Sequence, residues 1–234
     1  MENQVFQIHP QGYDTFSLMY SHYMKIVISP HIDVTEATNW YPDTFPMQRL
    51  LGYRGIQVSQ AYGIFTILTP EFLSQFSNIV EIGTYNGGLS AFIYDHKSTD
   101  CKFITYDIDG SINAVSSILP DIDCRVEDCF EQKTFDDIIE LIQSDGRSLV
   151  ICDGGDKPRE FNEFSKYLKS GDHIMCHDYQ RDENLWNFAC GFWQWPYAVD
   201  TSYTSIEQAV CDNNLIEYQR KPFEFIFWGS FIKE

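Results

Sequence analysis

Two acidic segments in the second half of the chain carry the side chains best suited to chemistry. The segment CDGGD contains Asp153 and Asp156, and the segment CHDY contains His177 and Asp178. Carboxylates and an imidazole can hold a divalent cation or move a proton, and they can also simply end two strands in solvent. Each segment follows a short apolar run, so the elements around them decide whether the side chains meet.

Short apolar runs alternate with helical patterns from about residue 79 to residue 176. This alternation predicts βαβ units and a parallel sheet. Near the end of the chain, SIEQAVCDNN predicts a helix, and LIEYQ and FEFIFWGSFIK predict an antiparallel strand pair at the sheet edge. If the strands before CDGG and CHDY are neighbours, both segments emerge at the same edge of the sheet.

The first part of the chain differs from the rest. Residues 1–75 are rich in Tyr, Phe, Pro and His, with a helical pattern only around RLLGYRGIQVSQAYGIFTILTPEFLSQF. We interpret residues 1–75 as an aromatic-rich N-terminal extension packed on a main domain of residues 76–234.

A glycine-rich turn begins that main domain. In IVEIGTYNGGLSAF an apolar strand closes with Glu81 and is followed by Gly83, Gly87 and Gly88 and then by a helix. The spacing departs from the G-x-G-x-x-G pattern of dinucleotide sites, which favours a cofactor without a pyrophosphate, although a tight turn alone would explain it. The next two strands end in Asp107, placed to accept from a ribose diol, and in Asp128, placed to accept from an adenine amine.

Together these features resemble the class I S-adenosylmethionine-dependent methyltransferases. The segments LVICDGGDK and YLKSGDHIMCHDY resemble the branch that contains macrocin-type sugar O-methyltransferases and cephalosporin hydroxylase-like proteins. The resemblance implies a Rossmann-like α/β fold with a doubly wound, mostly parallel seven-stranded sheet and an antiparallel C-terminal edge strand. It also implies S-adenosyl-L-methionine as the cofactor, contacted by Glu81, Gly83, Tyr85, Asn86, Gly87, Gly88, Asp107, Asp128 and Asp153.

The same resemblance implies a metal ion, Mg²⁺ or another divalent cation, held by Asp153, His177 and Asp178. Successive strand residues point to opposite faces, so His177 and Asp178 can share a site only if the strand ends or twists there. Asp178 is then the safer ligand. Asp156 and His177 are the candidates for a catalytic base, since Asp156 stands where many relatives carry His. Asp156 also precedes Lys157 and Pro158, as a helix cap would.

These features predict a metal-assisted O-methyltransferase that acts on a hydroxyl of a sugar or glycosylated small molecule. The aromatic segment at residues 186–197 could stack on a sugar ring or cover the sheet. Two alternatives remain open: a cephalosporin hydroxylase-like enzyme of another reaction class, and a non-catalytic binding protein on the methyltransferase fold.

Composition narrows the partners and the location. The chain has 16 Lys and Arg against 34 Asp and Glu, a formal charge of −18, which disfavours nucleic acids and anionic membranes. Seven Cys without a C-x-x-C pair, and a start without a signal peptide, favour a cytoplasmic protein. A small-molecule acceptor is the expected partner, and formation of a homo-oligomer is left open.

Overall fold

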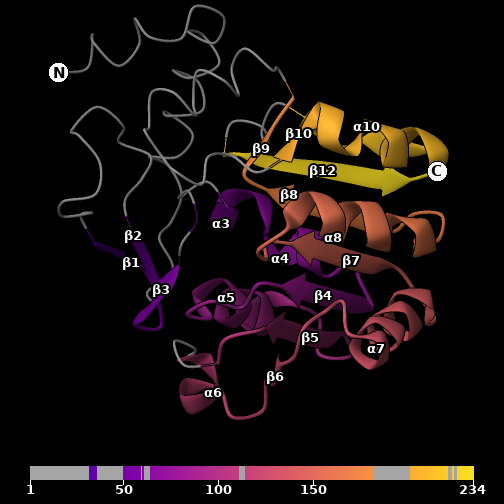
Figure 1. Cartoon of the computed structure of the whole chain (residues 1–234). Coiled ribbons are helices and arrows are strands. Elements are labelled where there is room, and N and C mark those ends of the chain that lie inside the picture. The colour runs from indigo at the N-terminus through magenta and orange to yellow at the C-terminus, as the bar shows by residue number, and fades with distance from the viewer. Residues whose placement is uncertain are drawn as a thin grey trace, which may run out of the picture.

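The computed structural model describes residues 32–35, 50–58, 60, 64–110, 114–181, 201–220, 223 and 226–234. Its centre is a seven-stranded sheet with the strand order β11-β12-β8-β7-β4-β5-β6 (Figure 1). The strands are β4 (Asn78–Ile82), β5 (Lys102–Asp107), β6 (Asp123–Val126), β7 (Ser148–Cys152), β8 (His173–His177), β11 (Leu215–Glu217) and β12 (Trp228–Lys233).

The directions of these strands confirm the predicted fold. Strands β6, β5, β4, β7 and β8 run parallel, whereas β12 is antiparallel to both of its neighbours, β8 and β11. The chain enters the sheet at β4, moves outward to β5 and β6, and then returns to β7 on the other side of β4. Ligands of open α/β sheets bind beyond the strand carboxyl ends where the order reverses, which here lies between β4 and β7.

Two apolar layers cover the sheet, one on each face. Ile79 and Leu149 face the layer that includes α5, while their neighbours Val80 and Val150 face the layer built from α7, α8 and α10. Both faces of the central strands are therefore buried, as expected for parallel strands. The helices are α3 (Ile64–Ile67), α4 (Pro70–Leu73), α5 (Gly88–His96), α6 (Val115–Ile118), α7 (Gln132–Gln143), α8 (Lys157–Phe164), the 3₁₀ turn η2 (Ser165–Tyr167) and α10 (Tyr203–Asp212).

The helical interpretation of residues 50–58 is wrong, because this segment forms strands. Strands β1 (Ile32–Thr35), β2 (Leu50–Tyr53) and β3 (Ile56–Val58) make a small antiparallel sheet at the left of Figure 1. Arg54 and Gly55 both have positive φ, the geometry of a two-residue hairpin turn. Tyr53 and Val58 are buried in the same layer as α5, so the hairpin packs on the sheet domain.

The C-terminal elements follow the prediction. Helix α10 matches the SIEQAVCDNN pattern, and β11 and β12 form the expected antiparallel pair. Short strands β9 (Tyr179–Gln180) and β10 (Thr201–Ser202) pair in parallel just after the end of β8. Among the helices that the structure describes, none combines the length and the apolar character needed to span a bilayer.

Candidate active site

The glycine turn lies at the point where the strand order reverses. Strand β4 ends at Ile82, and α5 begins at Gly88 after a turn in which Gly83 and Gly87 have positive φ. A Cβ atom on Gly83 would lie 2.1 Å from the backbone oxygen of Asp153, the residue that follows β7. Glycine is therefore required at position 83 both by its conformation and by the close approach of the next strand end.

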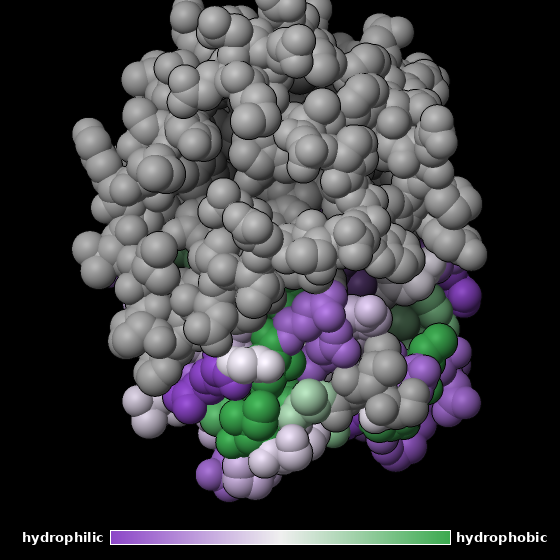
Figure 2. Space-filling view, turned by 90° about the vertical axis from the view of Figure 1, so that its left-hand side faces the viewer, coloured by the Kyte–Doolittle hydropathy of each residue, from purple (hydrophilic) through white to green (hydrophobic). Residues whose placement is uncertain are grey.

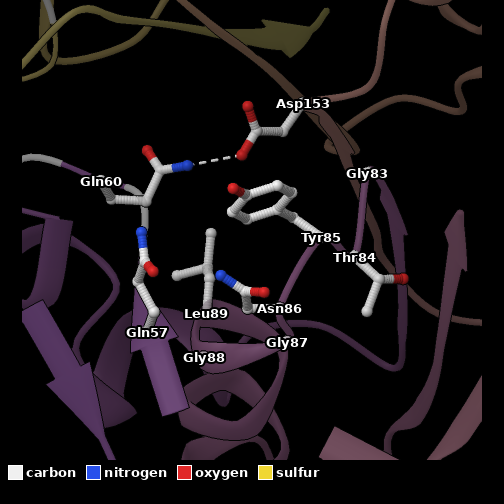
Figure 3. A pocket seen from close by; sticks show the side chains of 10 residues that line it. All are labelled: Gln57, Gln60, Gly83, Thr84, Tyr85, Asn86, Gly87, Gly88, Leu89 and Asp153. Atoms are coloured by element: carbon white, nitrogen blue, oxygen red, sulfur yellow. Dashed lines mark hydrogen bonds between the residues drawn. The ribbon is translucent and has the colours of Figure 1, made fainter. Parts of the chain in front are cut away.

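An open pocket lies against this turn, with about 240 Å³ of space when the adjoining open solvent is included. Figure 3 shows the ring of Tyr85 in the middle of the pocket, with Gln60 and Asp153 on one side and Asn86 and Leu89 on another. The residues that line it are Gln57, Gln60, Gly83, Thr84, Tyr85, Asn86, Gly87, Gly88, Leu89 and Asp153. Six of the nine predicted cofactor contacts are among them, and Gln57 and Gln60 come from the N-terminal segment.

Glu81, another predicted cofactor contact, lies in the core and does not line this pocket. Its side chain is 1% exposed and accepts hydrogen bonds from Ser90 on α5 and from Thr105 on β5, the latter at 2.7 Å. Burial raises the pKa of Glu81 to about 8, against the opposing effect of these two hydrogen bonds. In this arrangement Glu81 ties β4 to α5 and β5.

Asp107 and Asp128 lie at the ends of the next two strands. Asp107 accepts hydrogen bonds from the backbone N–H of Tyr85 at 2.6 Å and from that of Asp109 at 3.0 Å, and so holds the glycine turn. Asp128 is exposed and accepts from the N–H of Phe130 at 2.8 Å. Its position therefore also has a purely local explanation.

Each of these two strand ends carries an exposed apolar residue, which sequence reasoning missed. Ile108 follows Asp107 and is 75% exposed, and Val126 ends β6 and is 59% exposed. Figure 2 looks onto this side of the molecule and shows apolar and polar surface side by side in its lower part. Exposed apolar side chains next to an acid suit a ligand with a flat ring and a polar sugar. The aromatic segment at residues 186–197 lies outside the described residues.

On the other side of the pocket, Asp153, Lys157, His177 and Asp178 form a connected group that we call the charged edge. His177 Nδ1 lies 2.7 Å from Asp153 Oδ1 and donates to it, because a carboxylate oxygen can only accept. His177 Nε2 lies 3.7 Å from Asp178 Oδ1, and Lys157 Nζ lies 3.2 Å from Asp178 Oδ2. The structure thus brings together the three residues predicted as metal ligands and adds a lysine.

Strand β8 ends between His177 and Asp178, so both side chains can belong to the charged edge. Strand β8 ends at His177, and Asp178 has a φ of 52°, which is uncommon for a residue other than glycine. Burial opposes protonation of His177, but the carboxylates of Asp178 and Asp153 outweigh it and raise its pKa. Burial likewise opposes ionisation of Asp178, yet His177 and Lys157 lower its pKa.

Two residues that were not predicted as site residues, Gln60 and Trp228, contact the charged edge. Gln60 donates from Nε2 to Asp153 Oδ2 at 2.5 Å and accepts from Trp228 Nε1 at 3.1 Å. The indole of Trp228 also stacks on the ring of His177, with centroids 4.7 Å apart. Asp153 and His177 are therefore fixed in orientation by the N-terminal segment and by β12.

Asp156 caps helix α8. Its carboxylate accepts from the N–H of Arg159 at 3.3 Å, and Pro158 lies in the first turn. Buried Glu160 accepts from the N–H groups of Gly154 and Asp156, and burial raises the pKa of Glu160 to about 7. The two carboxylates together order the turn between β7 and α8. The structure therefore favours the cap interpretation of Asp156.

The arrangement of the charged edge does not present a metal-ligand set. The imidazole of His177 lies between Asp153 and Asp178, with one ring nitrogen toward each carboxylate. Lys157 Nζ contacts Oδ2 of Asp178. Within the described part of the chain, no group of three His, Cys, Asp or Glu side chains is placed to hold an ion. The carboxylate oxygens at this edge are arranged to bind the ammonium of Lys157 and not a divalent metal ion.

Comparisons with known proteins agree with the architecture. No protein-family model matches the sequence, and no curated protein sequence matches it. An apo structure of CmcI is 19% identical, with a TM-score of 0.58 over 82% of this chain and 78% of that chain. CmcI with Mg and SAM is 20% identical, with a TM-score of 0.56 over 83% and 79% of the two chains. CmcI with SAH is 19% identical, with a TM-score of 0.53 over 82% and 85%. This chain has the fold of the CmcI structures, a Rossmann-like α/β fold with a mostly parallel seven-stranded sheet.

Proposed function

We propose that this protein is an S-adenosylmethionine-dependent O-methyltransferase that acts on a hydroxyl group of a sugar or glycosylated small molecule. The observation that carries the proposal is the hydrogen bond between Asp153 and His177 at the rim of the glycine-turn pocket. An oriented imidazole beside a cofactor-type pocket is what proton removal from a hydroxyl requires. The sugar part of the proposal rests on the resemblance of the sequence motifs.

The glycine turn and the neighbouring strand end support this choice of cofactor. The turn from Gly83 to Gly88 presents backbone to the open space, Asp107 stands at the neighbouring strand end, and Ile108 offers apolar surface beside it. S-adenosylmethionine, when bound, supplies a methyl group on a positively charged sulfur. The CmcI structure with Mg and SAM, which has the same fold, supports this choice of cofactor.

The residues of the charged edge would then act on the acceptor. His177 would receive the hydroxyl proton at Nε2, which lies 3.7 Å from Asp178, longer than an ordinary hydrogen bond. Asp153 holds the other nitrogen, so it fixes the ring and stabilises the protonated form. Gln60 and Trp228 keep this pair in place before the acceptor arrives. No step of this mechanism uses a divalent ion.

The test separates cofactor binding from methyl transfer. Calorimetry should show that the wild type and Asp153→Asn both bind S-adenosylhomocysteine, because Asp153 lines only one side of the pocket. With a methyl-labelled donor and a panel of sugar and glycoside acceptors, transfer should occur with the wild type and fall at least about 100-fold in Asp153→Asn.

Asp156→Asn is the matched control, since Asn also caps helices and the position is three residues from Asp153. It should retain transfer. A wild type that binds neither the donor nor its demethylated product would overturn the proposal. Transfer that is lost in Asp156→Asn and kept in Asp153→Asn would instead assign the base to Asp156.

A further inference from the structure

Lys157 occupies a costly position. Its side chain is buried, with the residue 7% exposed, and it is the first residue of helix α8. The positive end of a helix dipole disfavours a cation there, and burial of an ammonium adds to that cost. The Asp178 carboxylate, 3.2 Å from Lys157 Nζ, offsets this cost. The ion pair thus keeps a positive charge at the charged edge.

Three of the four carboxylate oxygens of the charged edge already meet a hydrogen-bond donor or a cation. Asp153 Oδ1 meets His177 and its Oδ2 meets Gln60. Asp178 Oδ2 meets Lys157, whereas its Oδ1 lies 3.7 Å from His177 Nε2, the nitrogen left to receive a proton. An Mg²⁺ or Mn²⁺ ion needs several oxygens directed at one point. To gain them here, the ion would have to displace the ammonium and then remain beside it.

We propose that the ammonium of Lys157 is the resident cation of this site and takes the place of a divalent metal ion. The inference deepens the proposed function, because it makes methyl transfer by this chain independent of divalent metal. Asp178 is then a partner of Lys157 and not a metal ligand. Ion binding can be measured without donor or acceptor, so this part of the inference is tested separately.

The experiment is a Mn²⁺ titration of the full chain after treatment with EDTA and dialysis, followed by the electron paramagnetic resonance signal of free Mn²⁺. The wild type should leave the signal of added Mn²⁺ unchanged. Lys157→Gln removes the charge at similar length and should increase Mn²⁺ affinity by about tenfold or more, because the repulsion is gone and Asp178 loses its partner. Asp178→Asn in the Lys157→Gln background should remove that gain.

Lys157→Arg is the matched control, since it keeps the cation and should bind no more Mn²⁺ than the wild type. Circular dichroism checks that each variant is folded, and Lys157→Met replaces Lys157→Gln if the latter is not. One Mn²⁺ bound per wild-type chain, and lost in both Asp153→Asn and Asp178→Asn, would overturn the inference. So would a folded Lys157 variant without charge that gains no affinity. Failure of the proposed function would appear differently, as absence of S-adenosylhomocysteine binding.

Discussion

The two sides of the pocket are built in opposite ways. On the side of β4, β5 and β6, the backbone of the glycine turn forms the surface, and Asp107 holds that turn through the N–H of Tyr85. On the side of β7, β8 and β12, four ionisable side chains contact one another, and Gln60 and Trp228 hold them. One side owes its properties to shape and the other to charge.

This difference separates what each side contributes. The glycine-turn side tolerates little added volume, because Gly83 already lies against the backbone of Asp153. The charged edge depends on the identity of its polar atoms, because most of them contact a neighbouring side chain. A substitution that adds volume on the glycine-turn side should therefore lower the stability of the protein. A substitution that changes a polar group at the charged edge should lower its activity.

The largest effect is expected where the two sides touch. Gly83→Ala places a Cβ 2.1 Å from the Asp153 backbone oxygen at a φ of 96°. We expect the free energy of unfolding to fall by about 3 kcal/mol or more, measured by urea denaturation. Gly155→Ala is the control, because a Cβ there meets nothing within 4 Å. Equal losses in the two variants would contradict the comparison.

The second prediction tests the charged edge by substitution of His177. His177→Gln keeps a polar group of similar reach but cannot take up a proton, so methyl transfer should fall by about 100-fold while S-adenosylhomocysteine binding is unchanged. The control is His96→Gln on α5, a histidine whose ring hydrogen-bonds to the Phe92 carbonyl and stacks on the Phe92 ring. A loss of donor binding in His177→Gln would show that the two sides are not separable.

Glu81, which holds the strand before the glycine turn, should make the stability of the protein depend on pH. Its pKa is about 8 in the folded protein against an ordinary value of 4.5, so the folded state keeps a proton that the unfolded chain has lost. The stability that this proton provides is present below pH 4.5 and is lost as the pH rises through 8. Between about pH 6 and pH 8, Glu81→Gln should therefore lose less stability than the wild type, by about 2 kcal/mol.

Denaturation at a series of pH values measures this difference. Glu160 titrates in the same direction, with a pKa of about 7, but it is present in both proteins and cancels. Parallel stability curves for Glu81→Gln and the wild type would mean that Glu81 is ionised in the folded protein.

The smallest effect concerns the cap of α8, the helix that begins with Lys157 of the charged edge. Asp156→Ala removes the side chain that accepts from Arg159 and should cost about 1 kcal/mol of stability. Asp156→Asn should cost only a fraction of that, because Asn is an equally good cap. Thermal unfolding of the three proteins distinguishes the cap from a purely catalytic role, for which both substitutions would leave stability unchanged.

Much of the fold and part of the site were predictable because their signals are local. The apolar runs around Val80 and Val150 predicted parallel strands, and such strands place CDGG and CHDY at one edge. The glycine spacing located the pocket, and Asp156 with Pro158 predicted a helix start. Each of these inferences needs only a few consecutive residues.

What was missed depends on contacts between distant segments. The hairpin at residues 50–58 has a turn signal in Arg54 and Gly55, but its apolar residues also suit a helix, and only packing against α5 decides. Gln60 has no local feature that marks it as a partner of Asp153. Lys157 resembles any solvated lysine until β8 places Asp178 beside it.

The bond between Trp228 and Gln60 joins residues 168 positions apart in the sequence. Contacts of such separation form late in folding, whereas the glycine turn and α5 are local and can form early. During synthesis the chain would carry the pocket before β12 exists to insert between β8 and β11. The charged edge should therefore be the last part of the site to assemble, because a chain stopped before Trp228 lacks the indole that holds Gln60 and stacks on His177.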